Sequence, residues 1–190
     1  MKKLKIHQLF IVLLLLVMSS CLTTEKKEYV FKFTGKNTGT LTIRYINLMS
    51  TSDDSTDLSK QDFQELLNNF INGDQIKQEY PTATNIRKQL FELNGQLYAE
   101  VLMDFQNLET AKLYQYDSNS PFMLCLTTEK ETEHFVESNG SFGGKIMPVV
   151  FWNKDLKELS LTTSITQPDP STKSLAGPFR EWKKKQESIK

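Results

Sequence analysis

The chain opens with a run of apolar residues that has no polar face. Leu9–Met18 reads LFIVLLLLVM, three lysines precede it, and Ser19 and Ser20 follow it. A basic start, a short apolar run and small residues are typical of an export signal. Because the run has about half of the ~20 residues that a membrane-spanning helix needs, residues 1–20 are predicted to be a cleaved signal peptide.

Further along the chain, one segment has helical periodicity. Its apolar residues recur at positions i, i+3, i+4, i+7 and i+8, which places them on one face of a helix. They are Phe63, Leu66, Leu67, Phe70 and Ile71. Ser59 is a suitable N-cap with Asp62 three residues later, and Gly73 is a typical stop. These features predict a helix over residues 60–72.

Most other apolar segments are short and rich in β-branched or aromatic residues, as strands are. Residues 97–105 alternate most regularly, and Asn94-Gly95 before them is the strongest short hairpin signal. Strands are also predicted at 29–33, 40–48, 86–93, 121–128 and 133–138, with a final hairpin from 147–152 and 156–165. A short helix is expected at 107–114. A terminal helix is expected from Pro178, with Phe179 and Trp182 docked on the domain.

Together these elements predict an α+β fold. We expect a single domain, mainly an antiparallel sheet of about eight strands, with the 60–72 helix packed on it and a short C-terminal helix. The chain then divides into a signal peptide, a tether, a globular domain and a C-terminal tail. Their predicted bounds are 1–20, 21–28, 29–166 and 167–190.

Composition and charge narrow the possible partners. The 190-residue chain is 38% hydrophobic and 11% aromatic, which is enough for one core. Its formal net charge is zero, and without residues 1–20 it has 20 basic and 23 acidic residues, a net charge of −3. A mildly acidic chain has no general attraction for nucleic acid, so no nucleic-acid partner is expected.

The apolar run ends in Met18-Ser19-Ser20-Cys21, which places an aliphatic residue and two small residues before a cysteine. This tetrapeptide resembles the lipobox of bacterial lipoproteins. The resemblance implies cleavage before Cys21, thioether-linked diacylglycerol on its sulfur and usually an acyl chain on its amine. Two or more chains anchor a protein stably, whereas one is marginal. Cys21 is therefore the expected lipidation site, and the polar residues 22–28 are its expected solvated tether.

The same resemblance bears on location. It implies export and anchoring to a bacterial cell membrane. Leu22 is not the aspartate of the enterobacterial inner-membrane retention signal, which favours the outer membrane in a Gram-negative cell. The alternative is an ordinary secretory signal cut nearby, which would release a soluble exported protein.

The hexapeptide CLTTEK that begins at Cys21 occurs again from Cys125. Leu124 is too bulky to precede a lipidated cysteine, and no basic apolar leader stands before it. Cys125 lies instead in the short apolar run PFMLCL, which predicts a buried strand with Cys125 as a small core residue. If Cys21 is acylated, Cys125 has no disulfide partner in the chain, and otherwise the two could pair.

Candidate catalytic and metal-binding residues are few. His134 is the one histidine after the leader, so a His-dependent catalytic pair would need it, but its neighbours indicate a surface or sheet position. Too few cysteines and histidines remain for a structural zinc site. Asp53, Asp54 and Asp57 cluster before the predicted helix but lack the order of an EF-hand.

Three further features can be interpreted either as functional sites or as ordinary structural elements. The glycines of 138–144 lack the phosphate-loop pattern and are interpreted as a hairpin loop. Glu100 and Asp104 share a face of a strand and could act as a carboxylate pair, although an outward polar face explains them as well. Lys183–Lys185 beside Trp182 could contact anionic headgroups or form a solvated helix face.

These observations predict a lipid-anchored cell-envelope protein whose domain binds an envelope ligand, lipid or protein partner, with no catalysis, cofactor or metal. The alternative is an envelope hydrolase or lipid-modifying enzyme without a recognisable motif. The layout is similar to that of small α+β bacterial lipoproteins that bind lipids or other envelope components. An apolar pocket would support ligand binding, converging carboxylates would support an enzyme, and a flat apolar patch would support a protein partner.

Overall fold

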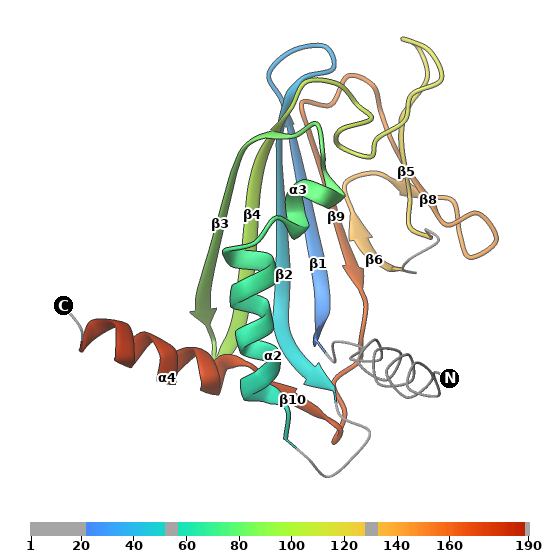
Figure 1. Cartoon of the computed structure of the whole chain (residues 1–190). Helices are drawn as coiled ribbons and strands as arrows, with labels where there is room; N and C mark the ends of the chain where they lie inside the picture. The colour runs from blue at the N-terminus through green and yellow to red at the C-terminus, as the bar shows by residue number, and fades with distance from the viewer. Residues whose placement is uncertain (1–21, 52–56, 128–132, 189–190) are drawn as a thin grey trace, which may run out of the picture.

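The computed structural model describes residues 22–51, 57–127 and 133–188. Figure 1 shows one large antiparallel sheet with helices on one face and a smaller sheet beside it. In spatial order, the strands of the large sheet are β3 (Thr84–Leu93), β4 (Gln96–Phe105), β2 (Gly39–Thr51), β1 (Leu22–Phe33), β9 (Glu158–Ser164) and β6 (His134–Ser138). A seventh strand, β10 (Thr172–Ser174), pairs with the end of β2. The α+β class and the mainly antiparallel sheet are therefore confirmed.

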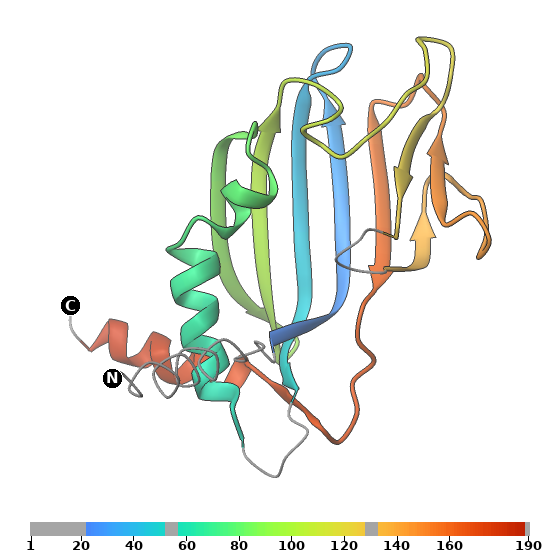
Figure 2. The same ribbon diagram turned by 45° about the vertical axis from the view of Figure 1, so that its right-hand side comes forward.

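Three helical segments lie over one face of the large sheet, above β2 and β4 (Figure 2). Helix α2 (Ser59–Glu65) continues directly into a π-helical segment, η1 (Leu66–Ile71), and α3 (Gln75–Glu79) follows. The apolar side chains that predicted this helix are buried in the same core as those of the sheet. The buried ones are Phe63, Leu66, Leu67 and Phe70. The predicted helix over 60–72 is confirmed in position and in its buried face.

The predicted cap of this helix is wrong. Leu58 occupies the N-cap without a side-chain cap, and the Ser59 backbone N–H donates to Asp57 Oδ1 at 2.9 Å. Asp62 points inward, where it is 2% exposed and accepts a hydrogen bond from the Ser50 hydroxyl of β2. Burial raises the pKa of Asp62, against the opposing effect of the Ser50 hydrogen bond.

This raised pKa gives a testable pH dependence. Because the folded-state pKa of Asp62 lies above its unfolded value, its contribution to stability is fully present below the unfolded pKa and is lost as pH rises through the folded-state pKa. Asp62→Asn removes the titration. We expect the free energy of unfolding of the wild type, relative to Asp62→Asn, to decrease as pH rises from about 4, the ordinary pKa of an aspartate, towards neutrality. Urea unfolding of both proteins across this range checks it, and parallel pH profiles would contradict it.

The hairpin of β3 and β4 follows the prediction closely. Asn94 and Gly95 have φ angles of 52° and 78°, the left-handed conformations that a tight hairpin turn requires. Alternate residues of β4 are fully buried on the covered face of the sheet. They are Leu97, Ala99, Val101, Met103 and Phe105. The intervening side chains face the open side, so the sheet has one packed face and one polar face.

Residues 22–28 differ most from the prediction. The expected solvated tether is instead the first half of β1, which pairs with β2 from Leu22 onward and with β9 from Lys26 onward. Lys27 is only 8% exposed. The predicted domain boundary at residue 29 is therefore too late. The folded domain begins at the residue covalently attached to Cys21, which itself lies outside the described residues.

The smaller sheet is built from segments that the sequence assigned differently. It consists of β5 (Phe122–Cys125), β8 (Val149–Trp152) and β7 (Ser141–Phe142), in that order. The predicted hairpin of 147–152 and 156–165 is wrong, because β8 joins this small sheet whereas β9 joins the large one. Phe122 stacks on Phe33 of β1 with ring centroids 4.7 Å apart, so the two sheets share one core.

Other local predictions are also corrected. Residues 107–114 form turns rather than a short helix. The described residues contain ten strands rather than about eight. Strand β5 is shorter than the predicted 121–128, and Cys125 at its end is exposed rather than buried. Its thiol donates to the Thr127 carbonyl oxygen at 3.3 Å.

The C-terminal segment returns to the end of the sheet at which β1 begins. After β10, helix α4 (Ala176–Glu187) starts at this end and extends outward past β3, crosswise to the strands (Figures 1 and 2). Phe179 is 6% exposed, and its ring centroid lies 6.4 Å from that of Phe63 on α2. Trp182 lies 6.2 Å from the same ring. The predicted docking of Phe179 and Trp182 is confirmed, and the helix begins two residues before Pro178.

Candidate functional site

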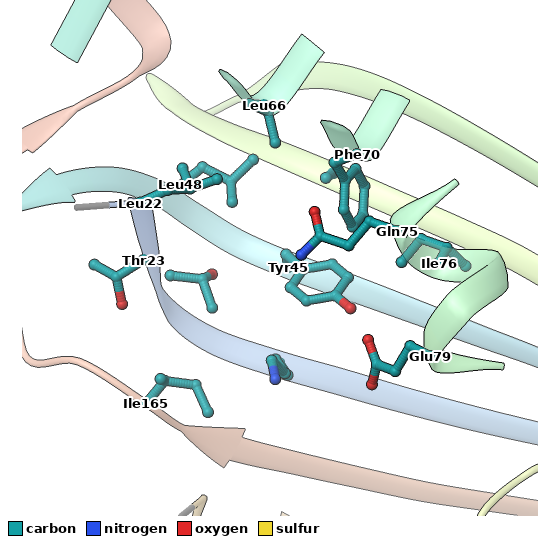
Figure 3. A pocket seen from close by; sticks show the side chains of 13 residues that line it. Leu22, Thr23, Tyr45, Leu48, Leu66, Phe70, Gln75, Ile76, Glu79 and Ile165 are labelled. Carbon is teal, nitrogen blue, oxygen red and sulfur yellow. The ribbon is translucent and has the colours of Figure 1, made fainter. Parts of the chain in front are cut away.

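A cavity of about 240 Å³ lies between the large sheet and the helical layer. Figure 3 shows η1 and α3 on one side of it and β1 and β2 on the other. Apolar side chains from both the sheet and the helical layer line it. They include Leu48 of β2, Leu66 and Phe70 of η1, Ile76 of α3 and Ala99 of β4. The cavity is slightly smaller than a typical ligand pocket of roughly 300–1,000 Å³, so it suits a small ligand or one end of a larger one.

The π-helical geometry of η1 shapes one wall. The Asn72 backbone N–H donates to the Leu67 carbonyl oxygen, five residues earlier, at 2.8 Å. Leu66 and Phe70 both line the cavity, and Phe70 packs edge-on against Tyr45 with ring centroids 5.3 Å apart. Short π-helical segments inside helices occur frequently at functional sites.

The other part of the lining is polar. Tyr45, Gln75 and Glu79 lie around the cavity in Figure 3. Lys27 of β1 lines it as well. The Lys27 ammonium lies 5.5 Å from the centroid of the Tyr45 ring, within reach of a cation–π attraction. The cavity therefore combines an apolar wall with charged and hydrogen-bonding groups, which matches the two-part chemistry of an amphipathic ligand.

One end of the cavity is formed by the start of the domain. Strand β2 bends at Asn47, whose φ is 56° and whose side-chain amide donates to Glu25 Oε2 at 2.8 Å. Beyond this point, Leu22 and Thr23 line the cavity together with Ile165. The first two residues after Cys21 are thus part of the cavity wall.

Beside the cavity, Glu133 holds a buried polar network on the covered face of the sheet. Its carboxylate accepts hydrogen bonds from the Lys27 ammonium at 3.2 Å, the Tyr29 hydroxyl at 2.6 Å and the Thr163 hydroxyl at 2.6 Å. The three donors come from β1 and β9, whereas Glu133 precedes β6. This network fixes the position of Lys27 at the cavity.

Two buried tyrosine hydroxyls, that of Tyr29 in this network and that of Tyr80 near it, stay protonated at neutral pH. Burial, and secondly the Glu133 carboxylate, raise the pKa of Tyr29 well above its usual value. Burial, with the Glu79 carboxylate, does the same for Tyr80. Both hydroxyls therefore serve as hydrogen-bond donors rather than as ionised nucleophiles.

The structure separates the other candidate residues from the cavity. Glu100 and Asp104 lie on the open face, where Glu100 Oε2 accepts from Arg44 Nε and Asp104 Oδ2 from Asn85 Nδ2, each at 2.6 Å. The outward polar face predicted for them is confirmed. His134 is exposed on β6, as predicted.

The remaining candidates are loops and the predicted anchor. The glycine-rich segment 138–144 is not the predicted hairpin loop, because it contains strand β7, which pairs with β8 in the small sheet, whereas β6 before it pairs with β9 in the large sheet. Asp57 is exposed, whereas Asp53 and Asp54 lie outside the described residues. Cys21 lies outside them as well. Lys183–Lys185 are exposed on α4.

The polar residues of the cavity were missed in the sequence. Lys27 lies in the run TTEKKE, whose polarity indicated solvent exposure. A usable signal was present, because Lys27, Tyr29 and Phe31 occupy every second position of one strand and therefore share a face. Tyr45 and Gln75 carry no comparable signal, since only the folding of α3 over β2 brings them together.

Within residues 22–51, 57–127 and 133–188, no group of three or more histidine, cysteine or acidic side chains is arranged to hold a metal ion. Among the helices formed by the same residues, none is long and apolar enough to cross a membrane. Comparisons of the chain with known protein families, with curated proteins and with solved structures found no match.

Proposed function

We propose that the protein is a lipid-anchored cell-envelope protein, held in the membrane by acyl chains on Cys21, whose domain binds a small amphipathic ligand in the cavity beneath η1 and α3. The observation that carries this proposal is the position of the cavity. Its wall includes Leu22 and Thr23, so the proposed anchor and the proposed binding site are covalent neighbours. The ligand is then a lipid, or another amphiphile, that is present at the membrane surface.

Binding accounts for the site better than catalysis does. The Glu133 carboxylate already accepts three hydrogen bonds from side chains, and an enzyme would need an acid or base free to exchange protons with a substrate. Glu79, which lines the cavity, is paired with Lys112 at 2.5 Å. Glu100 and Asp104 lie on the opposite face of the sheet. The large exposed apolar side chains are spread over several loops and strands rather than gathered on the cavity face, which favours a small ligand over a protein partner.

Filling the cavity tests the binding proposal. Ala99 is fully buried on β4 and lines the cavity, so Ala99→Leu places additional carbon atoms in the space a ligand would occupy. We expect the wild type to bind octanoate with about millimolar affinity or tighter, and Ala99→Leu to bind it at least about tenfold more weakly because of the steric overlap. Isothermal titration calorimetry measures both.

The control variant is Thr42→Leu, which adds bulk to the open face of β2. Thr42 pairs with Val30 of β1 and Leu102 of β4 on that face. It is expected to leave octanoate binding unchanged. Circular dichroism establishes that each variant is folded. Equal octanoate binding by the wild type and a folded Ala99→Leu variant would refute the cavity as the binding site.

A further inference from the structure

Helix α4 is held next to the point at which the chain enters the domain. Ser50 of β2 pairs with Leu22 of β1 on one side and with Lys173 of β10 on the other. Neighbouring strands lie about 4.8 Å apart, so Lys173 is about 10 Å from Leu22. The Leu175 backbone N–H donates to the Leu48 carbonyl oxygen at 3.0 Å, and α4 begins at the next residue.

The first half of α4 is occupied by contacts within the domain. Phe179 and Trp182 pack on Phe63 of α2. The charged residues between them are also paired, because Arg180 Nη1 lies 2.8 Å from Glu92 Oε1 and Glu181 Oε2 lies 3.1 Å from Lys60 Nζ. These contacts fix the direction in which the helix leaves the domain.

The second half of α4 is different, because it projects from the domain and carries unpaired positive charge. Lys183, Lys184 and Lys185 are exposed, and none of them forms an ion pair with any other residue that the structure describes. Three consecutive residues occupy different sides of a helix, so positive charge surrounds this part of α4. The remainder of the chain after residue 20 is net acidic, so this basic end is a local feature.

The position and direction of α4 place this charge at the level of the proposed anchor. The helix has 12 residues and is therefore about 18 Å long. Figures 1 and 2 show that it starts at the end of the sheet at which β1 begins and extends outward past β3, roughly perpendicular to the strands. A membrane that holds Cys21 next to Leu22 therefore lies within reach of Lys183–Lys185.

We propose that the exposed basic end of α4 rests on the anionic phospholipid headgroups of the membrane that holds Cys21. The proposal rests on the lipid anchor proposed above. The contact of α4 with the headgroups is a second attachment of the domain, about one helix length from the anchor on Cys21. Two attachments fix the orientation of the domain, with the Leu22 end of the cavity towards the bilayer. Basic residues at a helix C-terminus also stabilise the helix through its dipole, but that stabilisation does not depend on lipid.

Trypsin protection tests the proposal on the mature, acylated protein in vesicles. Trypsin cuts after exposed lysines, including Lys183–Lys185. In phosphatidylcholine vesicles that contain phosphatidylglycerol, we expect cleavage in α4 to be about tenfold slower than in phosphatidylcholine alone, and the difference to disappear at high salt. Cleavage after Lys36, in the exposed turn at the opposite end of β1 and β2, is expected to be equal in both. Intact mass follows the two sites separately.

Two matched variants isolate the charge. Lys183→Gln/Lys184→Gln leaves Lys185 as a cleavage site and is expected to reduce the protection to about twofold or less. Lys154→Gln/Lys157→Gln removes the same charge before β9, at the far end of the sheet, keeps Lys36 as the reference site and is expected to preserve the full effect. Equal cleavage of α4 in both kinds of vesicle overturns the proposal, provided the protein floats with both. Failure to float with either vesicle instead contradicts the lipid anchor.

Discussion

Cys21→Ala is expected to move the protein out of the membrane fraction. The variant has no thiol to carry diacylglycerol, and each acyl CH₂ contributes about 0.8 kcal/mol to membrane binding. We therefore expect the membrane-bound fraction of the processed protein to decrease by more than about a hundredfold. Fractionation of cells followed by immunoblotting measures it. Cys125→Ala is the matched control, and it is expected to leave the protein membrane-bound because Cys125 is an exposed thiol on β5.

The uncleaved leader must be distinguished from the anchor in this experiment. An uncleaved apolar run Leu9–Met18 could itself hold the variant at a membrane, so only molecules that have lost residues 1–20 are compared. Intact mass distinguishes the two forms. Processed Cys21→Ala protein that still sediments with membranes would contradict the anchor.

Glu133→Ala is expected to destabilise the domain by about 3–5 kcal/mol, the range found when one partner of a buried ion pair is removed. The substitution takes away the carboxylate shared by Lys27, Tyr29 and Thr163. Lys27 and Glu133 side chains are only 10% and 12% exposed, so water replaces the lost contacts poorly. Urea unfolding at neutral pH measures the loss as a lower midpoint with a similar slope.

Glu28→Ala provides the comparison at a surface ion pair. Glu28 lies 3.5 Å from Arg44, and their side chains are 36% and 45% exposed. Removing such an exposed partner is expected to cost at most about 0.5 kcal/mol. Lys27→Met/Glu133→Leu, which replaces both charges by apolar groups, is expected to recover most of the stability. A Glu133→Ala variant as stable as Glu28→Ala would show that the network does not hold β6 to the sheet.

The parts of the fold that were predictable from sequence are those whose causes are local. The 60–72 helix carries its own apolar stripe, and the β3–β4 hairpin is specified by Asn94-Gly95 and by the alternation of β4. Phe179 and Trp182 likewise indicated a docked terminal helix. In each case the signal lies within about ten residues of the structure that it specifies.

The start of β1 was misread because its burial depends on distant residues. TTEKKE is a polar run, and in isolation it is well solvated. In the fold, β2 and β9 flank it and Glu133, more than one hundred residues away, neutralises Lys27. The local sequence does not contain the acidic partner that offsets the cost of burying the lysine charge.

The assignment of β8 and β9 failed for a related reason. Their alternating patterns and the short turn between them are those of a hairpin. The choice of sheet was decided by packing, since Trp152 of β8 lies over Phe31 of β1 with ring centroids 6.2 Å apart, and Trp152 Nε1 donates to Ser138. Such long-range contacts select between locally equivalent pairings.

The central claim is that a membrane anchor on Cys21 places the cavity of the domain at a lipid surface. The most direct test is the mass of the N-terminal peptide of the mature protein, purified from the membrane fraction of cells that produce it from its own leader. We predict a peptide that begins at Cys21 and carries diacylglycerol, with or without an acyl chain on its amine. An unmodified peptide that begins beyond the leader, or a disulfide between Cys21 and Cys125, would contradict the claim.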